Sequence, residues 1–247
     1  MVEPATTSPA KYDLPFYNGS PVAFTLQQWL ALIALTCIAI TILLAPIGWF
    51  RGALAQFIPA ILFPLLPLLG IYCFAGNLGM LFRSVTRRGV ATMFGYAFAN
   101  LGITLLVGTL LARQVPVSPN AGIELLLEMP TNEIALFYIR TLPQLIGEEV
   151  FTIVPLLAIM TLCYQHFGWS RRSSLIVAWV ATAILFAVIH LPAYNWQLLQ
   201  CILVIGTARL VLSLAYLRTG NLWVSCGAHI INDWVLFSLA LLVGSQV

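Results

Sequence analysis

Seven long runs of apolar residues are the feature that most constrains how this chain can fold. A helix needs about 20 mostly apolar residues to cross a bilayer core of about 30 Å, and each run is close to or above that length. We therefore expect an all-α fold, a polytopic transmembrane helical bundle. Its spans are expected near residues 27–49, 53–75, 90–112, 133–166, 173–191, 196–217 and 221–244.

The scarcity of charge supports a lipid environment. Only 8% of the 247 residues are charged and 61% are hydrophobic, whereas a soluble domain carries about 25% charged residues. A chain this poor in charge could not cover a globular surface in water, so its main solvent is the lipid bilayer. No basic stretch interleaved with aromatic residues indicates a nucleic-acid partner.

Two segments have more than one interpretation. The run 133–166 is longer than a span requires, so it is tilted, begins as an interfacial helix, or consists of two segments broken near Pro143. Segment 114–132 carries Glu124 and Glu128 four residues apart among leucines, which is compatible with an amphipathic interfacial helix. A solvated loop is the alternative for that segment.

The domain organisation is simple. Residues 1–26 form a mixed N-terminal tail without the pattern of a cleaved signal peptide. Residues 27–247 form a single membrane-embedded domain, with the motifs described below in a core of about 130–240. Scattered cysteines without a CxxC pair are expected to be packing residues rather than a disulfide framework; they are Cys37, Cys73, Cys163, Cys201 and Cys226.

The distribution of basic residues predicts that the N-terminus is cytoplasmic, because cytoplasmic loops carry an excess of Lys and Arg. Two arginines, Arg140 and Arg209, fall inside spans. With the N-terminus inside, the far side holds only Arg51 and Arg113. The cytoplasmic side then holds Lys11, Arg83, Arg87, Arg88, Arg171, Arg172 and Arg218.

Ionisable residues inside the apolar runs point to a site. An ionisable side chain at the bilayer centre costs about 2.5–3.5 kcal/mol on insertion scales. Three separate spans nevertheless each carry such groups, and their convergence is what a catalytic or ion-conducting cavity requires. These residues are Glu148, Glu149, His190, His229 and Asp233, whereas His166 lies near a loop and should be solvated.

The adjacent glutamates cannot both face one reacting atom, because neighbours on a helix point about 100° apart. We expect one of Glu148 and Glu149 to line a cavity as a general base or acid while the other makes a structural contact. The alternative for either glutamate is a purely structural buried ion pair with Arg140 or Arg209.

The histidines also have two interpretations. His229 and Asp233 are four residues apart and share a helical face, so they could share a hydrogen bond that fixes the imidazole tautomer. A satisfied structural pair is the alternative. His190 ends its span before Leu191 and Pro192, so it could instead be interfacial.

These motifs, taken in order, resemble the CPBP family of intramembrane metalloproteases, also called the Abi or type II CAAX prenyl endopeptidase (Rce1-like) family. The family pattern is E-E-x-x-x-R, then F-x-x-x-H, then H-x-x-x-N/D, on different membrane helices. The chain matches it at Glu148–Glu149, at Phe186 with His190, and at His229 with Asp233. It departs from the pattern at Ile153, where the family has arginine; Arg140 or Arg209 could substitute.

The resemblance implies an endopeptidase of the membrane, in bacteria of the plasma (inner) membrane. It implies that Glu148 with His190 activates a water, that His229 and Asp233 stabilise the oxyanion, and that Glu149 supports an arginine. A zinc ion on Glu148, His190 and His229 is compatible with this, as is a metal-free glutamate mechanism. No organic cofactor is expected. The expected partner is a membrane-associated peptide or protein substrate.

Two other functions stay open at this point. The substitution at Ile153 would suit an inactive family member that acts as a membrane scaffold or immunity protein. The same Glu, His and Asp residues could pass protons in a proton-coupled transporter, although no inverted repeat supports one.

Overall fold

The computed structural model describes residues 13–44, 50, 52 and 54–244, and within these ranges it contains helices and no strand. Seven helical segments are long and apolar enough to cross a membrane, as expected. Lys11, Arg51 and the adjoining ends of the first two expected spans lie outside the described residues. The spanning segments are Leu26–Leu44 (α1), Phe57–Ala75 (α2), Arg87–Ala112 (α3), Thr131–His166 (α5 with a π-helical end), Arg171–Ile189 (α6), Leu198–Thr219 (α7 and α8) and Leu222–Gly244 (α9).

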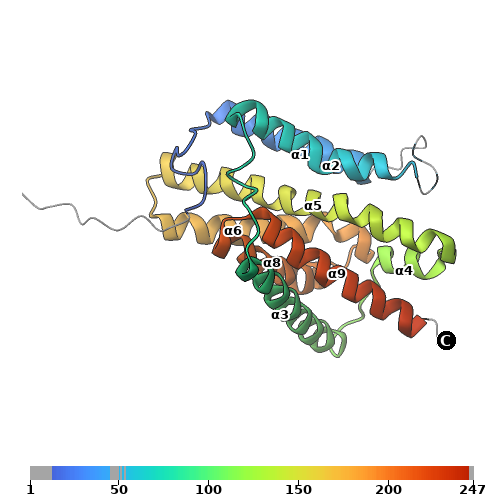
Figure 1. Ribbon diagram of the computed structural model, residues 1–247. Helices are drawn as coiled ribbons and strands as arrows, with labels where there is room; N and C mark the ends of the chain where they lie inside the picture. The colour runs from blue at the N-terminus through green and yellow to red at the C-terminus, as the bar shows by residue number, and fades with distance from the viewer. Residues whose placement is uncertain (1–12, 45–49, 51, 53, 245–247) are drawn as a thin grey trace, which may run out of the picture.

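Helix α5 runs through the centre of the molecule (Figure 1). The antiparallel pair α1 and α2 packs on one side of it, and α6 and α9 contact it on the other. Helix α8 lies between α6 and α9, and α3 covers the outer side of α8 and α9. Because α5 contacts both groups, its side chains are the most buried of all the spanning helices.

The overlong fourth run is one continuous helix, so the predicted possibility of a break near Pro143 is wrong. Helix α5 extends from Thr131 to Thr161 with Pro143 and Pro155 inside it, and a π-helical turn continues it to His166. Proline is tolerated in membrane helices where neighbouring groups satisfy the backbone that it frees.

Segment 114–132 contains a helix, as the amphipathic interpretation predicted. Helix α4 spans Ala121–Glu128, and the Asn120 side chain caps it by accepting hydrogen bonds from the first backbone amides. Leu126 is buried, whereas Glu124 and Glu128 are exposed. The short helix thus has one apolar face against the bundle, where it contacts α9.

The sixth span changes helical type along its length. A short α7 (Leu198–Gln200) leads into a π-helical turn (Cys201–Ile205, η3) and then into α8 (Gly206–Thr219). A single-turn 3₁₀ helix, η2 (Leu191–Tyr194), joins α6 to this span. Changes of this kind reorient the side chains that follow them and are frequent at functional sites.

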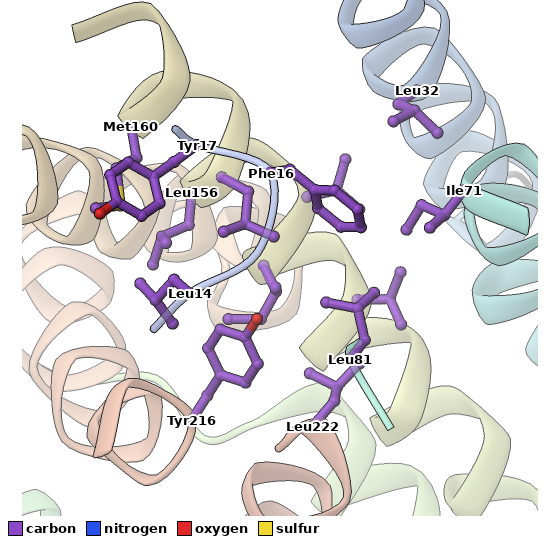
Figure 2. Packing of buried hydrophobic residues seen from close by; sticks show 14 of the residues in the cluster. Leu14, Phe16, Tyr17, Leu32, Ile71, Leu81, Leu156, Met160, Tyr216 and Leu222 are labelled. Carbon is purple, nitrogen blue, oxygen red and sulfur yellow. The ribbon is translucent and has the colours of Figure 1, made fainter. Parts of the chain in front are cut away.

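Part of the expected N-terminal tail packs on the bundle. Leu14, Phe16, Tyr17 and Phe24 are buried in an apolar cluster with residues of α1, α2, α5 and α8. Figure 2 shows Leu14, Phe16 and Tyr17 beside Leu156, Met160 and Tyr216. Segment 13–24 therefore closes one end of the core. Its composition did not predict this role, because its apolar residues are separated by polar residues and proline.

Candidate active site

A cavity of about 330 Å³ opens among α5, α6, α8 and α9. Its walls carry side chains from all three motifs, namely Glu148, His190, His229 and Asp233. The expected convergence of ionisable residues from three spans is thus observed. Arg140, Phe186 and Arg209 also line this cavity, which we call the central cavity.

The two adjacent glutamates of α5 have different surroundings. Glu148 lines the central cavity, and its Oε1 accepts a hydrogen bond from Gln144 Nε2 at 3.2 Å, one turn earlier. Glu149 is 0% exposed and does not line the cavity. This is the division expected from their 100° separation on a helix.

Glu149 lies between an arginine and a histidine. Its Oε1 accepts a hydrogen bond from the Arg209 guanidinium at 2.6 Å and lies 2.9 Å from His229 Nδ1. Because a carboxylate can only accept hydrogen bonds, His229 carries a proton on Nδ1. The contact therefore orients the imidazole so that its Nε2 faces the central cavity.

Arg209 places a positive charge beside Glu149, although it does not stand at the arginine position of the family pattern. That motif position, Ile153, is buried in the apolar cluster on α5. Arg209 comes instead from α8, and its guanidinium carbon lies 4.9 Å from the centre of the Phe186 ring. Of the two arginines that could have substituted, Arg209 is thus the one paired with a motif glutamate.

Arg140 occupies a different position. It lies on the wall of the central cavity and also lines a smaller hollow near α4. Its guanidinium carbon is 5.4 Å from the centre of the Phe137 ring, and its Nε has no hydrogen-bond partner in the part of the chain that the structure describes. Arg140 is therefore near the site but does not support Glu149.

His190 is held at the end of α6. Its Nδ1 lies 2.7 Å from the backbone oxygen of Phe186, and the two rings are 4.4 Å apart. Since a carbonyl only accepts, this contact also assigns the proton to Nδ1 and leaves Nε2 as an acceptor. His190 thus lies in the wall of the cavity. The alternative interpretation from the sequence was a position at the membrane interface.

The predicted hydrogen bond between His229 and Asp233 is not formed. His229 Nε2 is 3.6 Å from Asp233 and 3.8 Å from Glu148, beyond hydrogen-bonding distance in both cases. Glu149, not Asp233, fixes the tautomer. Asp233 accepts a hydrogen bond from Asn232 at 2.8 Å, and Asn232 accepts one from Asn100 of α3 at 2.9 Å.

Some polar residues of the cavity wall were not anticipated. Gln144 supports Glu148, and its position four residues earlier on the same helix was a usable signal. Asn100 and Tyr194 also line the cavity. The Tyr194 hydroxyl accepts a hydrogen bond from Asn120, which caps α4. Asn100 does not stand at a helical spacing from any motif residue, so the sequence contains no signal for it.

The residues expected to hold zinc, Glu148, His190 and His229, line the central cavity but are not gathered as a cluster of metal ligands. Within residues 13–44, 50, 52 and 54–244, no three His, Cys, Asp or Glu side chains are gathered so that they could hold a metal ion. Nδ1 of His229 and Nδ1 of His190 contact Glu149 and a backbone carbonyl, so Nε2 is the nitrogen of each ring that could bind a metal. Zinc bound by Glu148, His190 and His229 therefore stays a prediction.

Comparison with known proteins agrees with the motifs. No curated protein and no solved structure matches the chain. Residues 130–235 match the family described as Type II CAAX prenyl endopeptidase Rce1-like. This range begins at α5 and ends after Asp233, so it contains every motif residue described above. The family resemblance is therefore confirmed over residues 130–235, which are similar to the Rce1-like, type II CAAX prenyl endopeptidase family, and the seven apolar helices indicate a multi-pass membrane protein.

Proposed function

We propose that the protein is an intramembrane endopeptidase that hydrolyses a peptide bond of a membrane-associated peptide or protein. The observation that carries the proposal is the meeting of Glu148, His190, His229 and Asp233 around one cavity inside a helical bundle. The family match over the same segment supports the reaction class. Hydrolysis needs a base, a group that stabilises the oxyanion, and a space protected from bulk water. The central cavity is such a space, and Glu148 and His229 in its wall are the candidates for the two groups.

Glu148 is the proposed general base. It takes a proton from a water molecule, whose oxygen attacks the carbonyl carbon of the scissile bond. His190 Nε2, left as an acceptor by the bond of Nδ1 to Phe186, can hold the second proton of the same water. The protonated Glu148 then gives its proton to the departing amine as the C–N bond breaks, so water is divided between the two products.

His229 is the proposed oxyanion donor. Attack by water places negative charge on the former carbonyl oxygen, and a positioned imidazole N–H stabilises such charge well in a water-poor site. The Nδ1 atom of His229 donates to Glu149, so His229 donates from Nε2 into the cavity in its doubly protonated, imidazolium form. Asp233 acts through His229 or in its protonated form, because a carboxylate ion would repel the oxyanion.

The Arg209–Glu149 contact weakens the argument for an inactive scaffold. That argument rested on the replacement of the motif arginine by Ile153. The buried guanidinium on α8 nevertheless reaches the motif glutamate at 2.6 Å. An arginine delivered from another helix can therefore support the same glutamate, and the loss of the local arginine no longer favours inactivity.

The test is Glu148→Gln in protein reconstituted into vesicles with candidate peptide substrates, both prenylated and unmodified. Removing a general base should reduce the cleavage rate about 10²–10⁴-fold, whereas thermal stability should change little because Glu148 accepts only one side-chain hydrogen bond. Glu124→Gln is a matched control, since it removes an exposed carboxylate outside the cavity and should cleave at the wild-type rate.

The other outcomes separate the remaining functions. Equal cleavage by wild type and Glu148→Gln would overturn the assignment of the base. Binding of a protein partner without any cleavage would indicate a scaffold, and proton flux without cleavage would indicate a transporter. Metal analysis of the same samples, with cleavage measured before and after chelation, tests the predicted zinc separately.

A further inference from the structure

A second hollow, of about 910 Å³, lies between the first half of α3 and the turn that joins α8 to α9. None of its lining residues belongs to the central cavity. One part of the lining is basic, and the other part consists mainly of small residues together with Tyr96 and Val224. We call this hollow the arginine groove and define it by Arg83, Arg88 and Arg218 together with Thr92, Gly95 and Ala99.

Hydrogen bonds between distant segments fix the walls of the arginine groove. The Asn221 side chain accepts a hydrogen bond from the backbone amide of Arg83 and donates one to its carbonyl, at 3.1 and 3.0 Å. The backbone amide of Leu222 also donates to the carbonyl of Leu81 at 2.7 Å. The loop before α3 is thus tied to the start of α9, and the groove does not need a ligand in order to form.

The position of the groove corresponds to the edge of a membrane. Its basic end lies where one spanning helix ends, at Thr219, and where two begin, at Arg87 and Leu222. The ring of Trp223, which is 44% exposed, packs against Phe82 beside it with the ring centres 4.8 Å apart. Tryptophan is enriched at the level of lipid headgroups. The basic end is therefore at headgroup depth.

The other end of the groove extends along α3 into the apolar layer. Gly95 and Ala99 are exposed and lie two and three turns beyond the start of α3. A Cβ atom added at Gly95 would meet no other atom within 4 Å, so the surface there is open. Phe94 and Phe98 are exposed on the same stretch of helix. A chain of methylene groups could lie along this small-residue strip.

We propose that the arginine groove binds one anionic phospholipid. Its phosphodiester would lie among Arg83, Arg88 and Arg218, and one acyl chain would follow Gly95 and Ala99. Guanidinium groups bind phosphate oxygens in a two-pronged geometry, and the first turn of α3 adds the positive end of a helix dipole. A groove that is basic at headgroup depth and apolar below it matches both parts of such a lipid.

The choice of an anionic headgroup follows from charge. Arg83, Arg88 and Arg218 line the groove and no Asp or Glu does. A zwitterionic headgroup would bring an ammonium group toward these arginines, which repel it. The basic-residue pattern also predicts that this end faces the cytoplasm, where anionic lipids are concentrated.

The experiment titrates delipidated protein in a neutral maltoside detergent with phosphatidylglycerol or phosphatidylcholine and counts bound lipids by native mass spectrometry. The wild type should retain phosphatidylglycerol in preference to phosphatidylcholine. Arg88→Gln with Arg218→Gln should lower that affinity by roughly tenfold or more. The control Arg87→Gln with Arg172→Gln removes two exposed charges at the same end of the bundle, outside the groove lining, and should bind as the wild type does.

A second variant tests the acyl-chain part of the groove alone. Gly95→Leu keeps all the arginines, and its Cβ atom meets no other atom within 4 Å at this exposed position, so the variant should fold and yet lose phosphatidylglycerol. Equal lipid binding by the arginine variant and its control would overturn the proposal. So would a finding that inorganic phosphate or an acidic peptide occupies the groove while phosphatidylglycerol does not.

Discussion

Two neighbouring parts of helix α5 are equally buried but have opposite surroundings. Around Glu148 and Glu149 the helix meets charged and polar side chains from α8 and α9. From Ile153 to Met160 it meets an apolar cluster built from the N-terminal segment, α1, α2, α6, α8 and α9. Both Glu149 and Leu156 are 0% exposed. One helix therefore supplies the candidate site and, two turns later, the packing that holds the bundle together.

The two parts differ in whether their buried atoms find suitable contacts: close packing for the apolar atoms and hydrogen bonds for the polar ones. In the apolar part, dispersion contacts depend on shape alone, and Figure 2 shows the side chains of Leu14 and Tyr17 filling the space next to Leu156. In the polar part, no group of the described residues forms a hydrogen bond with Glu149 Oε2 or with the Nε and one terminal nitrogen of Arg209. Buried polar atoms without partners are costly. We therefore expect the polar part mainly to position the side chains of the candidate site, and the apolar part mainly to stabilise the fold.

The strongest test of this contrast removes one partner of the buried ion pair. Arg209→Met should destabilise the fold by about 3–5 kcal/mol, because it leaves Glu149 in the core without the guanidinium that balances its charge. The measurement is unfolding of the detergent-solubilised protein in a denaturing detergent titration. Arg209→Met with Glu149→Met should recover much of the loss, since apolar replacements of both partners are often neutral. A double variant as unstable as the single one would contradict the explanation.

The next test removes packing from the apolar part. Leu156→Ala should cost about 2–5 kcal/mol through lost contacts and the cavity that remains. The cleavage rate per folded molecule should be unchanged, because Leu156 does not line the central cavity. Leu105→Ala, at a lipid-facing position of α3 that is 56% exposed, is the matched control and should change stability by less than about 0.5 kcal/mol. A reduced rate in Leu156→Ala at full folding would show that the two parts are coupled.

The polar part was the easier of the two to predict from the sequence. Charged residues are so costly in lipid that Glu148, His190 and His229 are conspicuous in apolar runs, and their order matches a known family. Helical spacing also predicted that only one glutamate would line the cavity. The partner of Glu149 could not be chosen in the same way. Arg140 and Arg209 are equally unusual in sequence, and only the packing of α8 against α6 and α9 brings Arg209 to it.

The apolar part left almost no signal in the sequence. Leucine and isoleucine fill both lipid-facing and core-facing positions of these helices, so the hydrophobic pattern does not show which face packs. The sequence predicts a tail for the segment that contains Leu14, Phe16 and Tyr17, although these residues are buried in the core. Whether such a short and interrupted apolar segment is buried depends on the surface against which it packs, which the sequence does not show. The hydrogen bond expected between His229 and Asp233 failed for a related reason, since a carboxylate from another helix was the better partner.

The smallest expected effect concerns the attachment of the N-terminal segment to the apolar part. Asp13 accepts hydrogen bonds from Arg171 at 2.6 Å and from the Tyr17 hydroxyl at 2.7 Å. Burial alone would raise the pKa of Asp13, but these bonds outweigh it and leave the pKa below its ordinary value of 3.8. Burial and the neighbouring Asp13 raise the pKa of Tyr17 to about 12, so its hydroxyl remains a donor at neutral pH.

A group whose pKa is lowered by folding stabilises the fold above its ordinary pKa and loses that contribution as the pH falls through the folded value. Asp13→Asn should therefore destabilise the protein at pH 7 by less than about 1 kcal/mol, as for an exposed ion pair, and should destabilise it less at pH 3, below the ordinary pKa of 3.8. Thermal unfolding at both pH values measures the difference. A loss of several kcal/mol at pH 7 would mean that segment 13–24 is held mainly by this ion pair and not by its buried aromatic residues.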